Sequence, residues 1–600
     1  MNKSNLSPRL KAIGIISPFL IATVFLMFSN GRFPIASCVW LGSVFMLHFT
    51  RGGRGGVRLL LAYVGLSFAF GFQFYGMTPF GGVGYWIFSA AFGLTLALPY
   101  IADRYLGPRW HGLRRSLVFP LALVVSEYAA SFNPFGTWGS IAYSQYEHLP
   151  LLQLVSVTGL YGLTFLIGWF SSVAQSLWQA GLDVNKARNE CFAFALCLTA
   201  VVLYGEGRLT IFPPSAPTIR VASITRPDEN LFPYPPSANL NRRVMMGEPL
   251  TDAETAQLHQ RSNAIANFLF ARADTEAQAG AKLVTFGEFN FPVLLQYEPD
   301  LIQQAAEVAQ RRGIYIGVPM AVFNIGHKPS LDDKLVMIEP SGHIAWEYRK
   351  SEIPPGLEVA ILTPSAGQLP FVDAPSGRLG AAIAFDMDFP SFLVQAGRKH
   401  VDLMVVPENE YPQIDPIHSR MALYRALENG FNLLLHASQS LSLACDYEGR
   451  VLGLMDHYHA SDRVLVAELP TRGVTTIYSR CGYLFPWVCI VGICGVLASA
   501  ILRPNSQIGD RLDTTRPDAT GSEHNVAGCL IPLVAGGALA AYNPKLGMAA
   551  GGGTLAIAAI FKKGWAWWAL GVVIFGGTNE KSLGSEEWRN LRAFWSVTNN

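Results

Sequence analysis

Charged residues are scarce in this chain of 600 residues. Asp, Glu, Lys and Arg together make up 15% of it, and hydrophobic residues make up 50%. A typical soluble protein has about 25% charged residues, so this composition argues against a soluble protein and indicates a membrane protein. The formal net charge of +2 is close to neutral and gives no reason to expect nucleic acid as a partner.

Cysteine and histidine patterns that bind metals are missing as well. The eight cysteines form no Cys-x-x-Cys pair, and six of them lie in or beside apolar runs, where a small buried side chain is the simplest interpretation. His418 and His436 have no second potential ligand at a spacing typical of metal sites. We therefore predict no disulfide framework, no metal site and no cofactor.

Long apolar runs are what the chain has instead. Seven of them precede residue 210 and an eighth follows a long polar region: 11–29, 33–50, 57–75, 83–102, 115–131, 150–178, 190–206 and 484–502. Their lengths suit helices that cross a hydrocarbon core of about 30 Å. The sequence thus predicts a polytopic α-helical membrane protein with an inserted polar domain.

The loops between these runs predict the orientation. Lys and Arg follow the second, fourth and sixth runs and are absent after the third and fifth, with Arg32 as the one exception. Because basic loops stay in the cytoplasm, we expect a cytoplasmic N-terminus and a polar domain on the outer side of the membrane.

These patterns divide the chain into four parts. Residues 1–209 form a membrane domain of about seven helices, 210–478 form the polar domain, and 479–503 form an eighth membrane helix. A polar linker and a Gly/Ala-rich apolar tail follow at 504–600, and the sequence gives them no role.

Short β-branched runs alternate with amphipathic segments in the polar domain, which predicts a layered α/β fold. Strands are expected at 218–224, 283–286, 313–318, 335–338, 344–348, 379–385, 403–406, 432–436 and 463–467. Three residues with chemical significance lie at strand ends. They are an acid, Glu288, a cation, Lys350, and Ala384 in a strand that runs into a turn.

In this order, the segments of Glu288, Lys350 and Ala384 resemble the Glu-Lys-Cys triad of the nitrilase superfamily, with Ala384 at the position of the cysteine nucleophile. The chain as a whole is similar to the bacterial apolipoprotein N-acyltransferases. That similarity includes Glu358, which matches an additional essential acid, and the segments 133–139, 152–162, 425–430 and 476–482. It implies a nitrilase-like four-layer α-β-β-α sandwich on the periplasmic side of a bacterial inner membrane.

The resemblance also implies a reaction. Family members transfer an acyl chain from a phospholipid to the N-terminal diacylglyceryl-cysteine of a lipoprotein. Glu288 would accept protons, Lys350 would stabilise the oxyanion, and a cysteine would attack the ester. Ala384 has no lone pair, so we predict that catalysis is impaired or lost. Asp386, Ser391 and Cys445 are the nearest substitutes, and none occupies the turn of the nucleophile.

Two other interpretations stay open. One is a non-catalytic pseudoenzyme that binds lipid or lipoprotein, and the other is a membrane-tethered amidase of the nitrilase type. Whether Ala384 is natural or engineered is also open. The family commonly has Asn-Asp-Ala-Trp-Phe where this chain has Glu408-Asn409-Glu410-Tyr411-Pro412, and a second departure at 435–440 likewise favours natural divergence.

Overall fold

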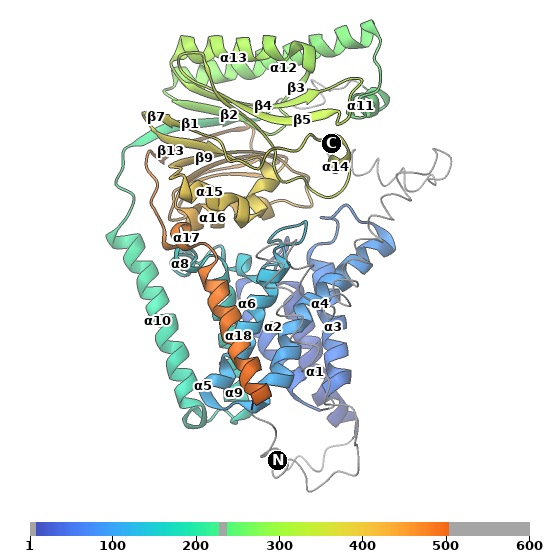
Figure 1. Ribbon diagram of the computed structural model, residues 1–600, viewed down its shortest axis with the longest axis vertical. Helices are drawn as coiled ribbons and strands as arrows, with labels where there is room; N and C mark the ends of the chain where they lie inside the picture. The colour runs from blue at the N-terminus through green and yellow to red at the C-terminus, as the bar shows by residue number, and fades with distance from the viewer. Residues whose placement is uncertain (1–7, 54, 227–236, 503–600) are drawn as a thin grey trace.

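The computed structural model describes residues 8–53, 55–226 and 237–502, and the predicted tail at 504–600 lies outside them. Figure 1 shows a bundle of long helices with a β-sandwich stacked on one end of it. The bundle contains α1 (Pro8–Met27), α2 (Ala36–Arg51), α3 (Gly55–Gln73), α4 (Gly82–Leu106), α5 (Gly112–Ser116), α6 (Val118–Ala130), α7 (Leu149–Leu152), α8 (Val155–Thr158), α9 (Tyr161–Gln179), α10 (Arg188–Ile211) and α18 (Leu484–Leu502).

Helices occupy all eight predicted apolar runs. Three of the described helical segments, Gly55–Gln73, Gly82–Arg109 and Val184–Ile211, are long and apolar enough to cross a membrane. A fourth qualifies if α7–α8 and α9 count as one span, although the chain bends by 116° between them. Eight crossings therefore stay a prediction, while the presence of several apolar helices supports a membrane protein.

A buried ion pair joins α2 to α4 inside the bundle. The Arg51 guanidinium donates to both carboxylate oxygens of Asp103 at 2.8 Å, and it also donates to the Ser172 hydroxyl in α9 at 3.1 Å. Such two-pronged pairing is the geometry in which a buried Arg and Asp compensate each other best. The three helices are thereby held in register at one end.

The polar domain contains two sheets. In the first the strand order is β13-β1-β2-β4-β5-β6, with β3 paired to β4, and in the second it is β12-β11-β10-β9-β8-β7. The strands are β1 (Thr218–Ile224), β2 (Leu283–Phe286), β3 (Phe291–Leu294), β4 (Tyr315–Phe323), β5 (Leu331–Ile338), β6 (Ile344–Arg349), β7 (Phe371–Ala374), β8 (Gly377–Ala381), β9 (Leu403–Asn409), β10 (Asn432–Ser438), β11 (Leu441–Cys445), β12 (Val451–Asp456) and β13 (Val464–Pro470). Strands β1, β2 and β4 run parallel, as do β8, β9 and β10.

Helices cover the outer face of each sheet (Figure 1). The first sheet packs under α12 (Asp252–Gln278) and α13 (Glu298–Arg312), and the second packs over α15 (Pro390–Arg398) and α16 (Ile417–Asn429). A third apolar core, with Leu283 from one sheet and Leu403 and Leu434 from the other, fills the space between the sheets. The predicted four-layer α-β-β-α sandwich is therefore confirmed. Shorter helices complete it: α11 (Ala238–Met245), α14 (Glu358–Ile361) and α17 (Ile477–Cys481).

Local signals in the sequence explain where the long helices of the sandwich begin and end. Thr251 and Glu254 form a reciprocal capping box at the start of α12, which satisfies two backbone donors of the first turn. Gly313 ends α13 with φ of +63°, a left-handed conformation that glycine adopts without strain. Gly430 ends α16 in the same way, at φ +77°.

The loop after α6 joins the bundle to the second sheet. Trp138 donates through its indole nitrogen to the Asp388 carboxylate at 2.6 Å, and Thr137 donates to the Asp388 carbonyl from its backbone at 3.2 Å and its hydroxyl at 2.9 Å. Gly136 has φ of +56°, and a Cβ atom there would lie 2.5 Å from the Asp388 carbonyl oxygen. Only glycine fits this close approach without movement of the backbone.

We predict that Gly136→Ala destabilises the protein by at least about 2 kcal/mol, because it combines a left-handed alanine with a backbone clash. Thermal unfolding of the detergent-solubilised chain would measure the loss. Gly139→Ala in the same loop is the matched control, since a Cβ there would meet only Phe92 at 3.9 Å. Equal midpoints for the two variants would contradict the proposed close approach.

Candidate functional site

The end of β2 and the end of β9 meet across the two sheets. The backbone N–H of Glu288 donates to the carbonyl of Glu408 at 3.2 Å, and the N–H of Asn409 donates to the Glu288 carboxylate at 2.8 Å. The carboxyl ends of parallel strands gather at one edge of a sheet. Glu288, the acid predicted from the sequence, therefore lies at the edge where β2 and β9 end.

Lys350 follows β6 and lies among carboxylates. Its ammonium donates to Glu288 at 2.9 Å and to Glu358 at 3.2 Å, and it lies 3.6 Å from Asp333 in β5. Lys350 and Glu288 are 4% and 2% exposed. The structure therefore brings Glu288, Lys350 and Glu358, all three predicted from the sequence, into one cluster.

The charges of this cluster depend on one another. Burial opposes the ammonium form of Lys350, but Glu288, Glu358 and Asp333 outweigh it and raise the pKa of Lys350 well above its usual value. Burial and the Glu288 charge raise the pKa of Asp333, and Lys350 opposes that rise. The three carboxylates thus favour the ammonium form of Lys350 in a site shielded from water, which is the condition for stabilising an oxyanion.

Ala384 begins a single 3₁₀ turn, Ala384–Asp388, and has φ of +40°. A non-glycine residue in this region costs about 1–2 kcal/mol. Phe289 and Gln439, at φ +59° and +61°, adopt the same conformation after β2 and β10. Backbone strain of this kind gathers at functional sites, and here it marks the ends of strands that carry Glu288 and Ala384.

The Asp386 carboxylate holds this turn against the segment of Lys350. It accepts hydrogen bonds from the Ile383, Ser351 and Glu352 backbone N–H groups at 2.8, 3.0 and 2.7 Å, and from the Tyr348 hydroxyl at 2.7 Å. Burial raises the pKa of Asp386 to about 6 against these hydrogen bonds. Since Ser351 and Glu352 directly follow Lys350, these hydrogen bonds tie the turn of Ala384 to the segment that carries the cation.

The other possible nucleophiles lie in unsuitable places. Asp386 is engaged in the hydrogen bonds just described, and Ser391 lies in α15, beyond the turn. Cys445 lies fully buried in β11, where burial raises the pKa of its thiol well above the usual value. A buried neutral thiol is a poor nucleophile.

Sequence reasoning missed two features of the site. Asp333 lies beside Lys350, and the run Asp332-Asp333-Lys334 within an otherwise apolar strand was its available signal. The second is a group of possible metal ligands around His418, for which the sequence spacing predicted no second ligand. That prediction was wrong. Ligand atoms of Glu408, Glu410 and His418 lie within 4.8 Å of one another, because the chain returns from β9 into α16.

Two families of known proteins match this chain. Residues 22–173 match the family described as apolipoprotein N-acyltransferase N-terminal domain, and residues 249–473 match the carbon-nitrogen hydrolase family. The chain belongs to the apolipoprotein N-acyltransferase family.

Relatives of this family cover most of the chain. The apolipoprotein N-acyltransferase of Geobacter metallireducens is 25% identical over 71% of this chain and 86% of its own length. That of Bradyrhizobium diazoefficiens is 23% identical over 70% of this chain and 79% of its own length. Among solved structures, an amidase from Nesterenkonia sp. matches with 16% identity and a TM-score of 0.33, over 43% of this chain and 92% of that one.

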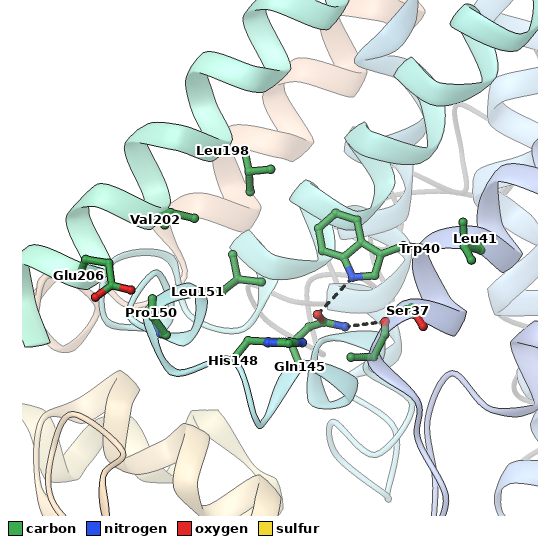
Figure 2. Close-up of a pocket in the computed structure, with 11 residues that line it drawn as sticks. Ser37, Trp40, Leu41, Gln145, His148, Pro150, Leu151, Leu198, Val202 and Glu206 are labelled. Atoms are coloured by element: carbon green, nitrogen blue, oxygen red, sulfur yellow. Dashed lines mark hydrogen bonds between the residues drawn. The ribbon is translucent and has the colours of Figure 1, made fainter. Parts of the chain in front are cut away.

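The membrane part of this family member contains a cavity of about 560 Å³ between α2, the loop before α7, and α10. Its lining includes Trp40, Leu41, Leu151, Leu198 and Val202, with His148 and Gln145 at the end nearer the sandwich (Figure 2). Gln145 accepts a hydrogen bond from the Trp40 indole at 3.1 Å and donates to the Ala36 carbonyl at 3.1 Å. The cavity is thus apolar along the helices and polar at one end.

We predict that Lys350→Met destabilises the protein by about 3–5 kcal/mol, because it leaves buried carboxylates without their cation. The pKa of Asp333 should rise further, so the folded state binds more protons than the unfolded state and stability should recover as the pH falls from about 8 to about 5. Denaturation of the detergent-solubilised protein at several pH values measures both effects.

Lys399→Met is the matched control, since the Lys399 ammonium donates to the backbone carbonyl of Leu369. It should neither lose comparable stability nor gain this pH dependence. A loss below about 1 kcal/mol for Lys350→Met, the range of a surface ion pair, would contradict the buried cluster.

Proposed function

We propose that this chain is a divergent apolipoprotein N-acyltransferase that binds the family substrates, a phospholipid acyl donor and a diacylglyceryl lipoprotein, and has lost covalent catalysis. The observation that carries the proposal is the buried Glu288–Lys350 pair beside the left-handed turn that begins at Ala384. The pair and the turn are the parts of a thioester-forming site, and the alanine lacks the atom that would form the bond.

The roles of the remaining residues follow from their chemistry. In a complete site, a thiolate at position 384 attacks the ester carbonyl of the phospholipid, and the lysophospholipid leaves with the proton that Glu288 took from the thiol. Lys350 stabilises the negative oxygen of the tetrahedral intermediate. Without the nucleophile, a concerted site can lose about a million-fold in turnover, while binding of the substrates needs no sulfur.

The structure of the membrane part favours lipids, rather than small soluble amides, as the substrates. The cavity of Figure 2 is lined by apolar side chains from α2 and α10, and we propose that it holds an acyl chain. The hydrogen bond from Trp138 to Asp388 ties the membrane loop directly to the turn of Ala384. An amidase that acts on small soluble amides would need no acyl-chain cavity in the membrane part.

We predict that Ala384→Cys restores the covalent step. Incubated with phospholipid, this variant should form a thioester that intact-mass spectrometry detects as one added acyl group, and the unmodified chain should form none. Ala382→Cys, two residues earlier and equally buried, is the matched control for acylation of a cysteine elsewhere in the segment.

Two results would contradict this assignment. One is a thioester on Ala382→Cys but not on Ala384→Cys. The other is N-acylation of a diacylglyceryl peptide by the unmodified chain at a rate similar to that of its relatives. Binding of fluorescent phospholipid to the unmodified chain tests the retained substrate site separately.

We also propose that the sandwich lies on the periplasmic side, because basic residues alternate between the loops. A reporter that fluoresces only in the cytoplasm should stay dark when it is fused after Ser215, between α10 and β1. The same reporter fused after His111, between α4 and α5, should be bright. Bright fluorescence from the Ser215 fusion would refute this orientation.

A further inference from the structure

A second group of titratable side chains lies beside the Lys350 cluster and has no part in the proposed acyl chemistry. Glu408 and Glu410 are two residues apart at the end of β9, so their side chains leave the strand on the same face. His418 comes from the first turn of α16. These three side chains are 0%, 4% and 5% exposed.

His418 lies between two carboxylates. Its Nδ1 contacts the Glu410 carboxylate, and its Nε2 lies 3.2 Å from the Asp388 carboxylate. The same Asp388 oxygen accepts the hydrogen bond from the Trp138 indole, so the position of Asp388 is fixed from the membrane side. The ring planes of Trp138 and Phe385 pack against the imidazole, with centroids 5.3 and 6.4 Å away.

Glu408 is the member of this group whose carboxylate makes no hydrogen bond within the described residues. Neither of its side-chain oxygens has a hydrogen-bond partner within the described residues, although the side chain is fully buried. The charges that act on it are the carboxylates of Glu410, Asp388 and Glu288, which oppose its ionised form, and His418, which favours it. A buried carboxylate with no partner is costly unless a proton or a cation neutralises it.

We propose that Glu408, Glu410 and His418 bind a divalent transition-metal cation, such as Zn²⁺ or Mn²⁺. Their potential ligand atoms already lie within 4.8 Å of one another, and two carboxylates with one imidazole are a ligand set that suits such ions. His418 binds through Nδ1, which faces Glu410, after that nitrogen loses its proton. Its Nε2–H then donates to Asp388, the second-shell arrangement that orients metal-binding histidines.

A bound cation would explain why this buried cluster of carboxylates is stable. It supplies the positive charge that Glu408 lacks, and it replaces the close contact between His418 and Glu410 with two bonds to the metal. The site lies outside the Glu288–Lys350–Glu358 cluster and does not depend on the acyl-transfer proposal, since it uses neither Ala384 nor a lipid.

The test begins with the full chain, purified in detergent without chelators and with any affinity tag removed. Its metal content is measured after dialysis against micromolar Zn²⁺ or Mn²⁺, and affinity is measured by competition with a chromogenic chelator. We expect about one equivalent of metal per chain and a higher thermal midpoint with the metal than with EDTA. Mg²⁺ alone should give a smaller shift, because it prefers an octahedral shell of oxygen ligands.

Three variants locate the site. Glu408→Gln and His418→Gln should abolish stoichiometric binding, and Asp388→Asn should weaken it about 10–100-fold. Glu352→Gln, a half-buried carboxylate near the same turn, should bind like the unmodified chain. Glu408→Gln removes the uncompensated charge, so without metal it should be at least as stable as the unmodified chain, which keeps a loss of binding distinct from misfolding.

Two outcomes would overturn the proposal. A chain that holds less than a tenth of an equivalent and shows no thermal shift with either ion would mean that a proton neutralises Glu408. Equal metal content in Glu408→Gln, His418→Gln and the unmodified chain would place the metal elsewhere. Both readouts are independent of thioester formation by Ala384→Cys, so failure of one proposal does not imply failure of the other.

Discussion

The hydrogen bond between Trp138 and Asp388 ties the helical bundle to the turn on which the candidate site depends. Trp138 belongs to a loop of the helical bundle, and Asp388 ends the turn that begins at Ala384. The glycine at 136 lets the two backbones approach, and Thr137 adds two hydrogen bonds to the same residue. Because Asp388 also faces His418, one carboxylate connects the membrane part, the turn of Ala384 and the second acidic group.

Buried charge determines what the two neighbouring clusters can do. In the first, Lys350 is shared among Glu288, Asp333 and Glu358, and the ammonium is held in its charged form by its surroundings. In the second, His418 faces Glu410 and Asp388 while Glu408 has no hydrogen-bond partner among the described residues. Low dielectric strengthens each favourable pair and increases the cost of each unpaired charge. The first cluster is thus suited to stabilising a developing oxyanion, whereas in the second a single imidazole faces several carboxylates.

The sequence predicted those parts of the fold whose signals are local. Strands β1 and β2 lie at the predicted residues, because each is a β-branched or apolar run bounded by polar residues. The strand expected at 379–385 ends early, at Ala381, since Asp386 draws the backbone into a turn through hydrogen bonds with Ser351 and Glu352. That partnership spans 35 residues of sequence, and no local pattern encodes it. Strands β3, β7, β11 and β12 were missed for a related reason, because short strands at sheet edges or hairpins carry little periodicity of their own.

The residues of the site divide in the same way, into those with local signals and those without. Glu288 and Lys350 could be predicted from strand ends and family resemblance, whereas Asp333 and the group around His418 depend on contacts between distant segments.

The turn of Ala384 does not depend on the side chain at its first position. Four hydrogen bonds to the Asp386 carboxylate, from Tyr348, Ser351, Glu352 and Ile383, fix the backbone on both sides of it. An alanine at φ +40° gains nothing locally that would offset the strain of about 1–2 kcal/mol, so the surrounding contacts must impose the conformation. A backbone imposed from outside keeps its shape when the residue within it changes. The backbone geometry of this turn is thus independent of the side chain at position 384. On the proposed assignment of Ala384 to the nucleophile position, the surrounding scaffold keeps its shape around an alanine.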